Sequence, residues 1–177
     1  MTTPKKLSPN QINHFRTHGY LPYSTIFSAK EINALQQAYM DCLNRLHHEN
    51  QLKNIRPGTR DDGAVSCWMA FDDATVDNGC MWVLPNHHHK LWDHSRIKSG
   101  GYTMTDPDES QAIPIELKAG QIMFHHGATP HRTLPNTTEN HRRALAIHYM
   151  DATARPLGGN RESEPPENMP VVRGTTS

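Results

Sequence analysis

The spacing of hydrophobic residues along the chain changes near residue 64. Before this point, apolar residues recur every three or four positions, as they do on one face of an amphipathic helix. After it, they alternate with polar residues or form short runs bounded by Gly, Pro, Asn and Asp, which is typical of strands and turns. The pattern predicts an α+β chain in which two helices are followed by short strands that form a sandwich or barrel.

Both predicted helices begin with a capping box, in which a Ser and a residue three positions later satisfy each other's backbone N–H groups. Ser8 and Gln11 open the first helix, over residues 8–18, and Ser28 opens the second, over residues 29–46. Six residues at helical spacing give the second helix one apolar face: Ile32, Leu35, Tyr39, Cys42, Leu43 and Leu46. We expect this face to pack on the β core.

Short apolar runs in the second part of the chain predict strands. These runs are residues 64–71, 80–84, 113–117, 121–126 and 143–150. We expect the first two to form a hairpin with a long connection, and the last two to form another hairpin around the turn-rich segment between them. The polar residues 90–112 predict an excursion without regular structure, and the chain after Met150 predicts an irregular tail.

A histidine and an arginine flank the turn of the last predicted hairpin. His131 precedes the turn, and Arg142 opens the returning strand 11 residues later. An antiparallel pair of strands can hold both side chains over one cavity. A neutral imidazole binds metal ions, and a guanidinium binds a carboxylate through two parallel hydrogen bonds. The alternative is that His131 is a surface turn residue and that Arg142 is solvated.

Length and charge limit the organisation and the partners of the chain. The 177 residues carry no net charge, so no basic surplus indicates nucleic acid or an anionic membrane. No apolar run is long enough to span a bilayer, and the N-terminus lacks the apolar core of a signal peptide, which predicts a soluble, cytoplasmic protein. We expect one domain over residues 1–155, with helices in 8–46 and the β core in 64–150, and an irregular tail over 156–177.

Histidine and cysteine are the side chains that most often bind transition metals, and the chain contains both. The three cysteines (Cys42, Cys67 and Cys80) have no CxxC spacing and predict reduced core residues. Thirteen histidines is a high number for this length and favours metal chemistry. Three of them, at residues 87–89, follow a proline and cannot all point one way, so we expect an exposed loop there. A metal-storage or metal-sensing role of this run is the alternative, although no second cluster has the spacing to complete such a site.

Three long segments carry a family resemblance: LSPNQINHFRTHGYLPYSTIFSAKEINALQQ, AVSCWMAFDDATVDNGCMWVLPNHH and GQIMFHHGATPHRTLPNTTENHRRALAIHYM. The chain resembles the phytanoyl-CoA dioxygenase family, whose members are non-haem Fe(II)- and 2-oxoglutarate-dependent oxygenases. The resemblance implies a double-stranded β-helix (jelly roll) with N-terminal helices packed on the sheet. It also implies Fe(II), 2-oxoglutarate and dioxygen as cofactor and cosubstrates, and a small organic molecule as substrate.

The resemblance also implies roles for single residues in the third segment. His131 matches the family's distal iron ligand, and Arg142 matches the arginine that pairs with the far carboxylate of 2-oxoglutarate. Asn136 and Thr138 fall on the family's Asn and Ser in the connecting turn, so they too are implied to bind the cosubstrate. In the second segment, Trp68 falls on the family's strand tryptophan.

The chain departs from the family at the other iron ligands, because it contains no H-x-D motif. His47 with Glu49 keeps a histidine and a carboxylate, whereas His48 with Asn50 lies closer to the family's spacing but offers a neutral amide. Both pairs follow a helical pattern, in which residues i and i+2 do not share a face. The family's long segment before the H-x-D strand has no counterpart here, which predicts an incomplete jelly roll with exposed sheet edges that favour self-association.

Two hypotheses follow. In the first, iron held by His131, His47 and Glu49, together with 2-oxoglutarate bound by Arg142, serves the oxidation of a substrate C–H bond. In the second, the chain is a truncated, non-catalytic member of the same family that no longer holds iron, because metal affinity requires several converging ligands. The residues do not identify the substrate.

Overall fold

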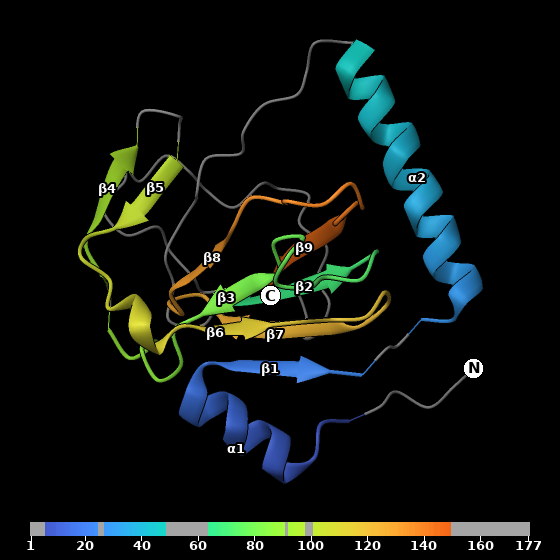
Figure 1. The fold of residues 1–177 in the computed structure, drawn as a ribbon. Helices are drawn as coiled ribbons and strands as arrows, with labels where there is room; N and C mark the ends of the chain where they lie inside the picture. Colours follow the sequence, from blue (N-terminus) through green and yellow to red (C-terminus); the bar gives the residue numbers. More distant parts are fainter. Residues whose placement is uncertain (1–5, 25–26, 49–63, 91, 98–100, 150–177) are drawn as a thin grey trace, which may run out of the picture.

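The computed structural model describes residues 6–24, 27–48, 64–90, 92–97 and 101–149, and of residues 43, 46–48, 96–97 and 101–102 it describes the backbone alone. The elements follow in the order α1 (Pro9–His18), β1 (Tyr20–Tyr23), α2 (Ala29–His48), β2 (Val65–Ala70), β3 (Met81–Val83), β4 (His94–Ile97), β5 (Gly101–Met104), η1 (Glu109–Gln111), β6 (Ile113–Ile115), β7 (Ile122–His126), β8 (His131–Thr133) and β9 (Ala144–Tyr149). Figure 1 shows α1 beside β1 and α2 along one side of the sheets. No helix in these described ranges is long and apolar enough to cross a membrane.

Two antiparallel sheets form the β core. The larger has the strand order β1-β7-β2-β9 and the smaller has the order β6-β3-β8, while β4 and β5 form a separate hairpin. The two sheets pack face to face, because one cluster of buried side chains draws on both of them. Its members from the sheets include Trp68, Ala70, Met81, Val83, Ile115 and Met123. The result is a jelly-roll-like α+β fold, as the sequence predicts.

The register of the strands fixes which residues face the interior between the sheets. In the larger sheet, Trp68 of β2 lies opposite Met123 of β7 and Ala146 of β9. Trp68 and Met123 belong to the interior cluster, so residues two positions away on the same strands also point inwards. In the smaller sheet, Met81 and Val83 of β3 define the interior face in the same way.

The outer face of the larger sheet is covered by α2. The buried residues of this face are Cys67, Met69, Phe71 and Ile122, and the partly buried residues packed against them include Phe27, Leu35 and Tyr39. The ring of Tyr39 meets that of Phe71 edge to face, with 5.9 Å between centroids. The predicted packing of the second helix on the sheet is therefore confirmed.

Both predicted helix starts are confirmed by their capping hydrogen bonds. The Ser8 backbone N–H donates to the Gln11 side chain at 2.8 Å, and the Gln11 N–H donates back to the Ser8 hydroxyl at 3.3 Å. Ser28 and Glu31 form the same box at the start of α2. Gly19 ends α1 with a φ of 80°, in the left-handed region where glycine is favoured.

Both predicted hairpins are wrong in their pairing. β2 and β3 lie in different sheets, and β7 and β9 both pair with β2 instead of with each other. The turn after β2 carries the chain from one sheet to the other, and a single bridge between Ala74 and Leu117 fixes this crossing. Alternation along a sequence identifies a strand but not its partner, which packing across the whole fold selects.

Two further expectations need correction. Residues 90–112 contain the β4–β5 hairpin and the short helix η1, where the sequence predicted no regular structure. The two strands pair with each other within the described residues and belong to neither buried cluster, so hydrophobic periodicity does not reveal them. Cys67 and Cys80 are buried and free as predicted, but Cys42 is exposed and does not belong to the core.

Candidate functional site

His131 lies on the inner face of the smaller sheet. It is the first residue of β8 and pairs in register with Val83, a member of the interior cluster. The ring nitrogen Nδ1 donates to the carbonyl oxygen of Thr129 at 2.9 Å, which fixes the ring and leaves Nε2 free to accept or to bind a metal. Thr129 is itself held, because its buried hydroxyl donates to the Gly19 carbonyl at 2.8 Å. This geometry is compatible with the predicted metal-binding role of His131, which stays a prediction.

His131 combines access to solvent with a lowered pKa. The residue is exposed, yet desolvation by the surrounding protein lowers the pKa of its imidazole below the usual value, and the nearby His148 acts in the same direction. The hydrogen bond to Thr129 partly opposes this shift. A neutral imidazole at physiological pH is the form that binds a metal ion.

A polar row crosses the inner face of the larger sheet next to His131. The row consists of four residues that lie directly opposite one another on adjacent strands: Tyr20, His125, Ser66 and His148. The ring centroids of His125 and His131 are 4.4 Å apart, so the two sheets bring two imidazoles into contact. The Ser66 hydroxyl and Nδ1 of His148 are hydrogen-bonded at 2.7 Å. Burial, and then the neighbouring His131, lower the pKa of His125 to about 3, so its ring is neutral.

Arg142 has a buried polar atom without a partner. Its Nε is buried and makes no hydrogen bond, and no ion pair of this side chain is found in the described residues. Burial is the main cause that raises the pKa of the Cys80 thiol, and the positive charge of Arg142 lowers this pKa. This effect of the charge indicates that the guanidinium lies near Cys80. Cys80 belongs to the interior cluster, as does Val83 beside His131. A buried guanidinium N–H without an acceptor is costly unless a ligand supplies one.

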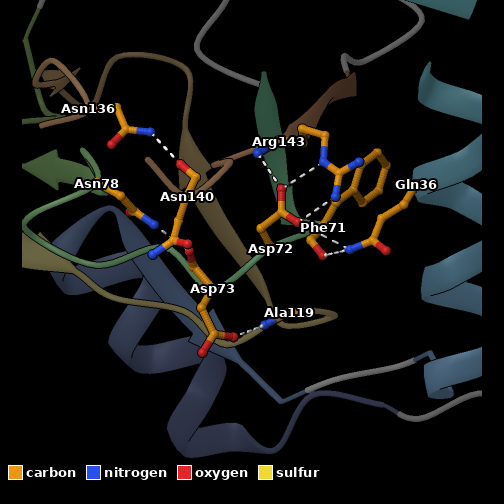
Figure 2. A network of polar contacts seen from close by, with 9 residues as sticks. All are labelled: Gln36, Phe71, Asp72, Asp73, Asn78, Ala119, Asn136, Asn140 and Arg143. Atoms are coloured by element: carbon orange, nitrogen blue, oxygen red, sulfur yellow. Dashed lines mark hydrogen bonds and ion pairs between the residues drawn. The ribbon is translucent and has the colours of Figure 1, made fainter. Parts of the chain in front are cut away.

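The side chains of Asn136 and Thr138 build the turn that leads to Arg142. Asn136 Oδ1 accepts from the Thr138 backbone N–H at 2.8 Å and from its hydroxyl at 2.9 Å. The Asn136 amide donates to the Asn140 carbonyl at 2.7 Å, as Figure 2 shows. Most of their hydrogen-bonding capacity is therefore used within the turn. Contact of either side chain with a cosubstrate stays a prediction.

Arg143 turns the opposite way from Arg142 and binds Asp72. Its Nε and Nη2 donate to the two carboxylate oxygens at 2.9 Å and 2.7 Å, and its backbone N–H donates at 2.8 Å. Gln36 of α2 donates to Asp72 at 3.2 Å and to the Phe71 carbonyl at 2.6 Å (Figure 2). The hydrogen bonds from Arg143 are the largest cause that lowers the pKa of Asp72. This network ties α2 and the start of β9 to the end of β2.

An acidic concave surface beside this network encloses a volume of about 510 Å³. Its lining residues are Asp72, Asp73, Thr75, Asp77, Asn78, Thr138, Asn140 and His141. Two of the three carboxylates are already committed: Asp72 binds Arg143, and Asp73 accepts from the Lys118 side chain and from the Ala119 N–H. The surface is therefore built from structural ion pairs and does not form a metal site.

The other predicted iron ligands fall where the structure gives no side chains. α2 continues through His48, so the backbones of His47 and His48 are helical, but their side chains, and the whole of Glu49 and Asn50, lie outside the described residues. Within the ranges that are described, no group of three or more His, Cys, Asp or Glu side chains is arranged to hold a metal ion. The carboxylate ligand of the predicted iron site is thus not among them.

The histidine run at residues 87–89 is less exposed than expected. His88 is buried, its Nε2 donates to the Arg16 carbonyl at 3.1 Å, and its Nδ1 is buried without a partner. A Cβ atom at Gly19 would lie 2.5 Å from that Nδ1, so glycine allows the close approach. His89 is exposed, as predicted. The run lies outside the helices and strands, as predicted, but it packs partly against the end of α1, and the predicted exposure is wrong for its middle residue.

Sequence reasoning missed His125 and His148 as residues of this site. The signal was present, because His125 is two positions from the apolar Met123 and so shares its inward face on β7. His148 likewise alternates with Ile147 and falls on the opposite side of β9. Residues 121–126 form a mostly apolar run, so the pattern predicts a strand there without indicating that His125 points to the interior.

The sequence matches a known family over more than half of its length. Residues 41–144 match the family described as phytanoyl-CoA dioxygenase (PhyH). The chain is 32% identical over 89 residues to "Phytanoyl-CoA dioxygenase 1" of Oryza sativa subsp. japonica, a match that covers 48% of this chain and 32% of that protein. The chain thus spans roughly a third of the length of the curated relatives it matches.

Solved structures with similar folds include proteins crystallised with 2-oxoglutarate. EvdO2 from Micromonospora carbonacea var. aurantiaca, complexed with 2-oxoglutarate, aligns with a TM-score of 0.65 and 19% identity over 88% of this chain and 98% of that chain. The epimerase SnoN, in complex with Fe3+, alpha ketoglutarate and nogalamycin RO, aligns with a TM-score of 0.62 and 18% identity over 93% and 92% of the two chains. At these identities the likeness shows the fold.

Proposed function

Because this chain belongs to the phytanoyl-CoA dioxygenase family, we propose that it is a non-haem Fe(II)- and 2-oxoglutarate-dependent oxygenase that acts on a small organic substrate. The matched residues include every site residue predicted from the sequence, His131 and Arg142 among them. Two proteins of similar fold are described as complexes with 2-oxoglutarate, one of them also with Fe3+, which supports the same pair of ligands for this chain.

The buried, unpartnered Nε of Arg142 is the observation that carries the proposal. A guanidinium presents two parallel N–H donors to a carboxylate, and this bidentate contact is among the stronger hydrogen-bonded pairs in proteins. 2-Oxoglutarate offers such a carboxylate at the end remote from its keto group. We assign Arg142 to this carboxylate, which would satisfy the atom that the protein leaves without an acceptor.

His131 fits the role of a metal ligand. Its Nδ1–H is bound to a backbone carbonyl, so Nε2 carries the free lone pair, and its pKa is lowered. We propose His47 and Glu49 as the remaining protein ligands, as the sequence predicts, and Asn136 and Thr138 as cosubstrate contacts. Bound iron would supply the activation of dioxygen, coupled to decarboxylation of 2-oxoglutarate. The chain itself orients the cosubstrate through Arg142 and fixes the tautomer of His131.

Turnover of 2-oxoglutarate tests this function. Purified protein with Fe(II), ascorbate and 2-oxoglutarate under air is expected to form succinate and carbon dioxide in equal amounts, at a slow rate without substrate. His131→Ala is expected to abolish succinate formation. His94→Ala removes an exposed histidine of the β4–β5 hairpin and is the matched control, for which we expect the wild-type rate. Wild-type protein that forms no succinate above the His131→Ala background would contradict the oxygenase function.

A second function is favoured by two observations on the metal ligands. Within the described residues no three potential ligands converge, and the sequence has no H-x-D motif. The alternative proposal is therefore a non-catalytic member of the family that binds a dicarboxylate through Arg142 without holding iron. It predicts 2-oxoglutarate binding that is unchanged by Fe(II) and no succinate formation. The predicted self-association and cytoplasmic location are proposals under either function.

A further inference from the structure

We propose that His125 is a second imidazole ligand of the metal ion that His131 binds, so that the metal site is made by facing strands of the two sheets. This inference rests on the proposed function, because it concerns the same ion. It differs from the sequence prediction, in which the second histidine is His47 from the end of α2. In this arrangement, His125 of β7 takes the place of His47 as the second histidine, and the other predicted ligand, Glu49, is unaffected.

The separation of the two rings is that of neighbouring ligands on one ion. The centroids of His125 and His131 are 4.4 Å apart, and the rings are inclined at 48°. Two imidazoles whose nitrogens lie about 2.1 Å from one ion, at a right angle, have centroids about 4.5 Å apart. The observed centroid separation therefore matches that expected for two imidazoles on one ion.

Both rings leave the same nitrogen free. Nδ1 of His131 contacts the Thr129 carbonyl at 2.9 Å, and Nδ1 of His125 contacts the His126 carbonyl at 3.2 Å. A carbonyl oxygen only accepts, so each Nδ1 must carry the hydrogen and each Nε2 the lone pair. No hydrogen bond reaches either Nε2 from the described residues. Ligand histidines in metal sites usually show this pattern, with the second nitrogen donating to an oxygen.

The position of His125 is also unusual for a polar side chain. Only 4% of the residue is exposed. On the same face of the sheet, the next pair of facing residues is Trp68 and Met123, both members of the interior cluster. The ring of His125 therefore lies among apolar side chains, with its Nδ1 held by a backbone carbonyl and its Nε2 without a hydrogen-bond partner in the described residues. A metal ion shared with His131 would be that partner.

His148 is the other histidine near the pair, and it is placed differently. It lies opposite Ser66, whose hydroxyl is hydrogen-bonded to its Nδ1 at 2.7 Å. No ring contact joins it to His125 or His131 in the described part of the chain, and no three ligands converge there. The described residues thus contribute two histidine ligands, and the other coordination positions of the ion are left for further ligands and for the cosubstrate.

Zinc titration followed by nitrogen-15 NMR of the histidine side chains tests the proposal on the full chain. Zn(II) is a diamagnetic probe for Fe(II), and long-range correlations resolve each ring once the resonances are assigned. We expect the Nε2 resonances of His125 and His131 to move together, with one common midpoint. In His131→Ala, the response at His125 should require at least about tenfold more zinc, because one of the two imidazole ligands is lost. His94→Ala should leave the midpoint unchanged.

The outcomes separate this inference from the proposed function. If His131 responds to zinc and His125 does not, the inference is wrong while His131 keeps its role as a ligand. If neither ring responds, the two histidines are only packed against each other, and the metal site of the proposed function fails as well. His125→Phe keeps an aromatic ring in the core and should also weaken zinc binding about tenfold or more by calorimetry; unchanged affinity in a folded variant would overturn the inference.

Discussion

Arg142 and Arg143 are adjacent in the sequence, but only Arg143 has a carboxylate partner. Arg143 holds Asp72 through three hydrogen bonds, whereas Arg142 has a buried Nε without any acceptor in the described residues. Consecutive residues of an extended chain point to opposite sides. One arginine therefore fastens β9 to the fold, and the other keeps a buried N–H without an acceptor in the described residues, as its proposed contact with 2-oxoglutarate requires.

Replacing Arg142 by Gln is expected to weaken 2-oxoglutarate binding. Removing a charge-assisted contact to a carboxylate costs about 1.5–3 kcal/mol, so the dissociation constant should rise roughly 10- to 150-fold. Anaerobic calorimetry with Fe(II) present measures this change. Arg132→Gln is the matched control, since Arg132 lies on β8 next to His131 but pairs with Glu109. Equal affinities of the Arg142→Gln and wild-type proteins would remove Arg142 from the cosubstrate site.

Replacing Asp72 by Asn is expected to destabilise the fold. The change keeps the shape of the side chain but removes the charge that Arg143 binds, and both side chains are largely buried, with 16% and 20% exposed. We expect the free energy of unfolding to fall by about 2 kcal/mol, as measured by urea denaturation. Asp73→Asn should have a smaller effect, because Asp73 is half exposed. If both variants lose equal stability, the anchoring role of the Asp72–Arg143 pair is wrong.

The same pair predicts how stability depends on pH. The folded-state pKa of Asp72 is lowered, mainly by the hydrogen bonds from Arg143, relative to about 3.9 in an unfolded chain. Its contribution is therefore fully present above about pH 5 and is lost as the pH falls through the lowered pKa. The difference in stability between the wild type and Asp72→Asn should shrink from pH 6 to pH 3. A constant difference over that range would contradict this assignment.

Replacing Gly19 by Ala is expected to disturb both stability and the site. A Cβ atom there would lie 2.5 Å from Nδ1 of His88 and 2.7 Å from the Thr129 hydroxyl, at a φ of 80°. The left-handed backbone and the crowding together should cost at least about 2 kcal/mol. Since Thr129 also fixes His131, metal binding should weaken in the same variant. Gly127→Ala, at an exposed glycine without positive φ, should cost under about 1 kcal/mol in the same thermal or urea melts.

Local signals in the sequence predict most of the elements. The capping boxes at Ser8 and Ser28 locate both helices, and alternation locates β7 and β9, because these signals depend on neighbouring residues only. Strand partners were predicted wrongly, since β2 separates β7 from β9 through contacts between residues far apart in the chain. The β4–β5 hairpin was missed because it lies outside both buried clusters.

The site residues that belong to sequence motifs could be predicted, whereas a contact between residues of two stacked sheets could not. His131 and Arg142 were identified from the spacing and the family resemblance, and the structure places both beside the interior cluster. The prediction that a single hairpin holds both residues over one cavity is wrong, because β8 and β9 belong to different sheets. The contact of His125 with His131 depends on how the sheets are stacked, which no local pattern encodes.

An anaerobic optical titration tests the central claim most directly. Purified protein is loaded with Fe(II), 2-oxoglutarate is added without oxygen, and the visible spectrum is recorded for the wild type and for His131→Ala. We expect a weak charge-transfer band in the wild type that saturates with 2-oxoglutarate and is lost in His131→Ala. A wild-type spectrum that remains unchanged at saturating 2-oxoglutarate would contradict an iron site at His131 that binds the cosubstrate.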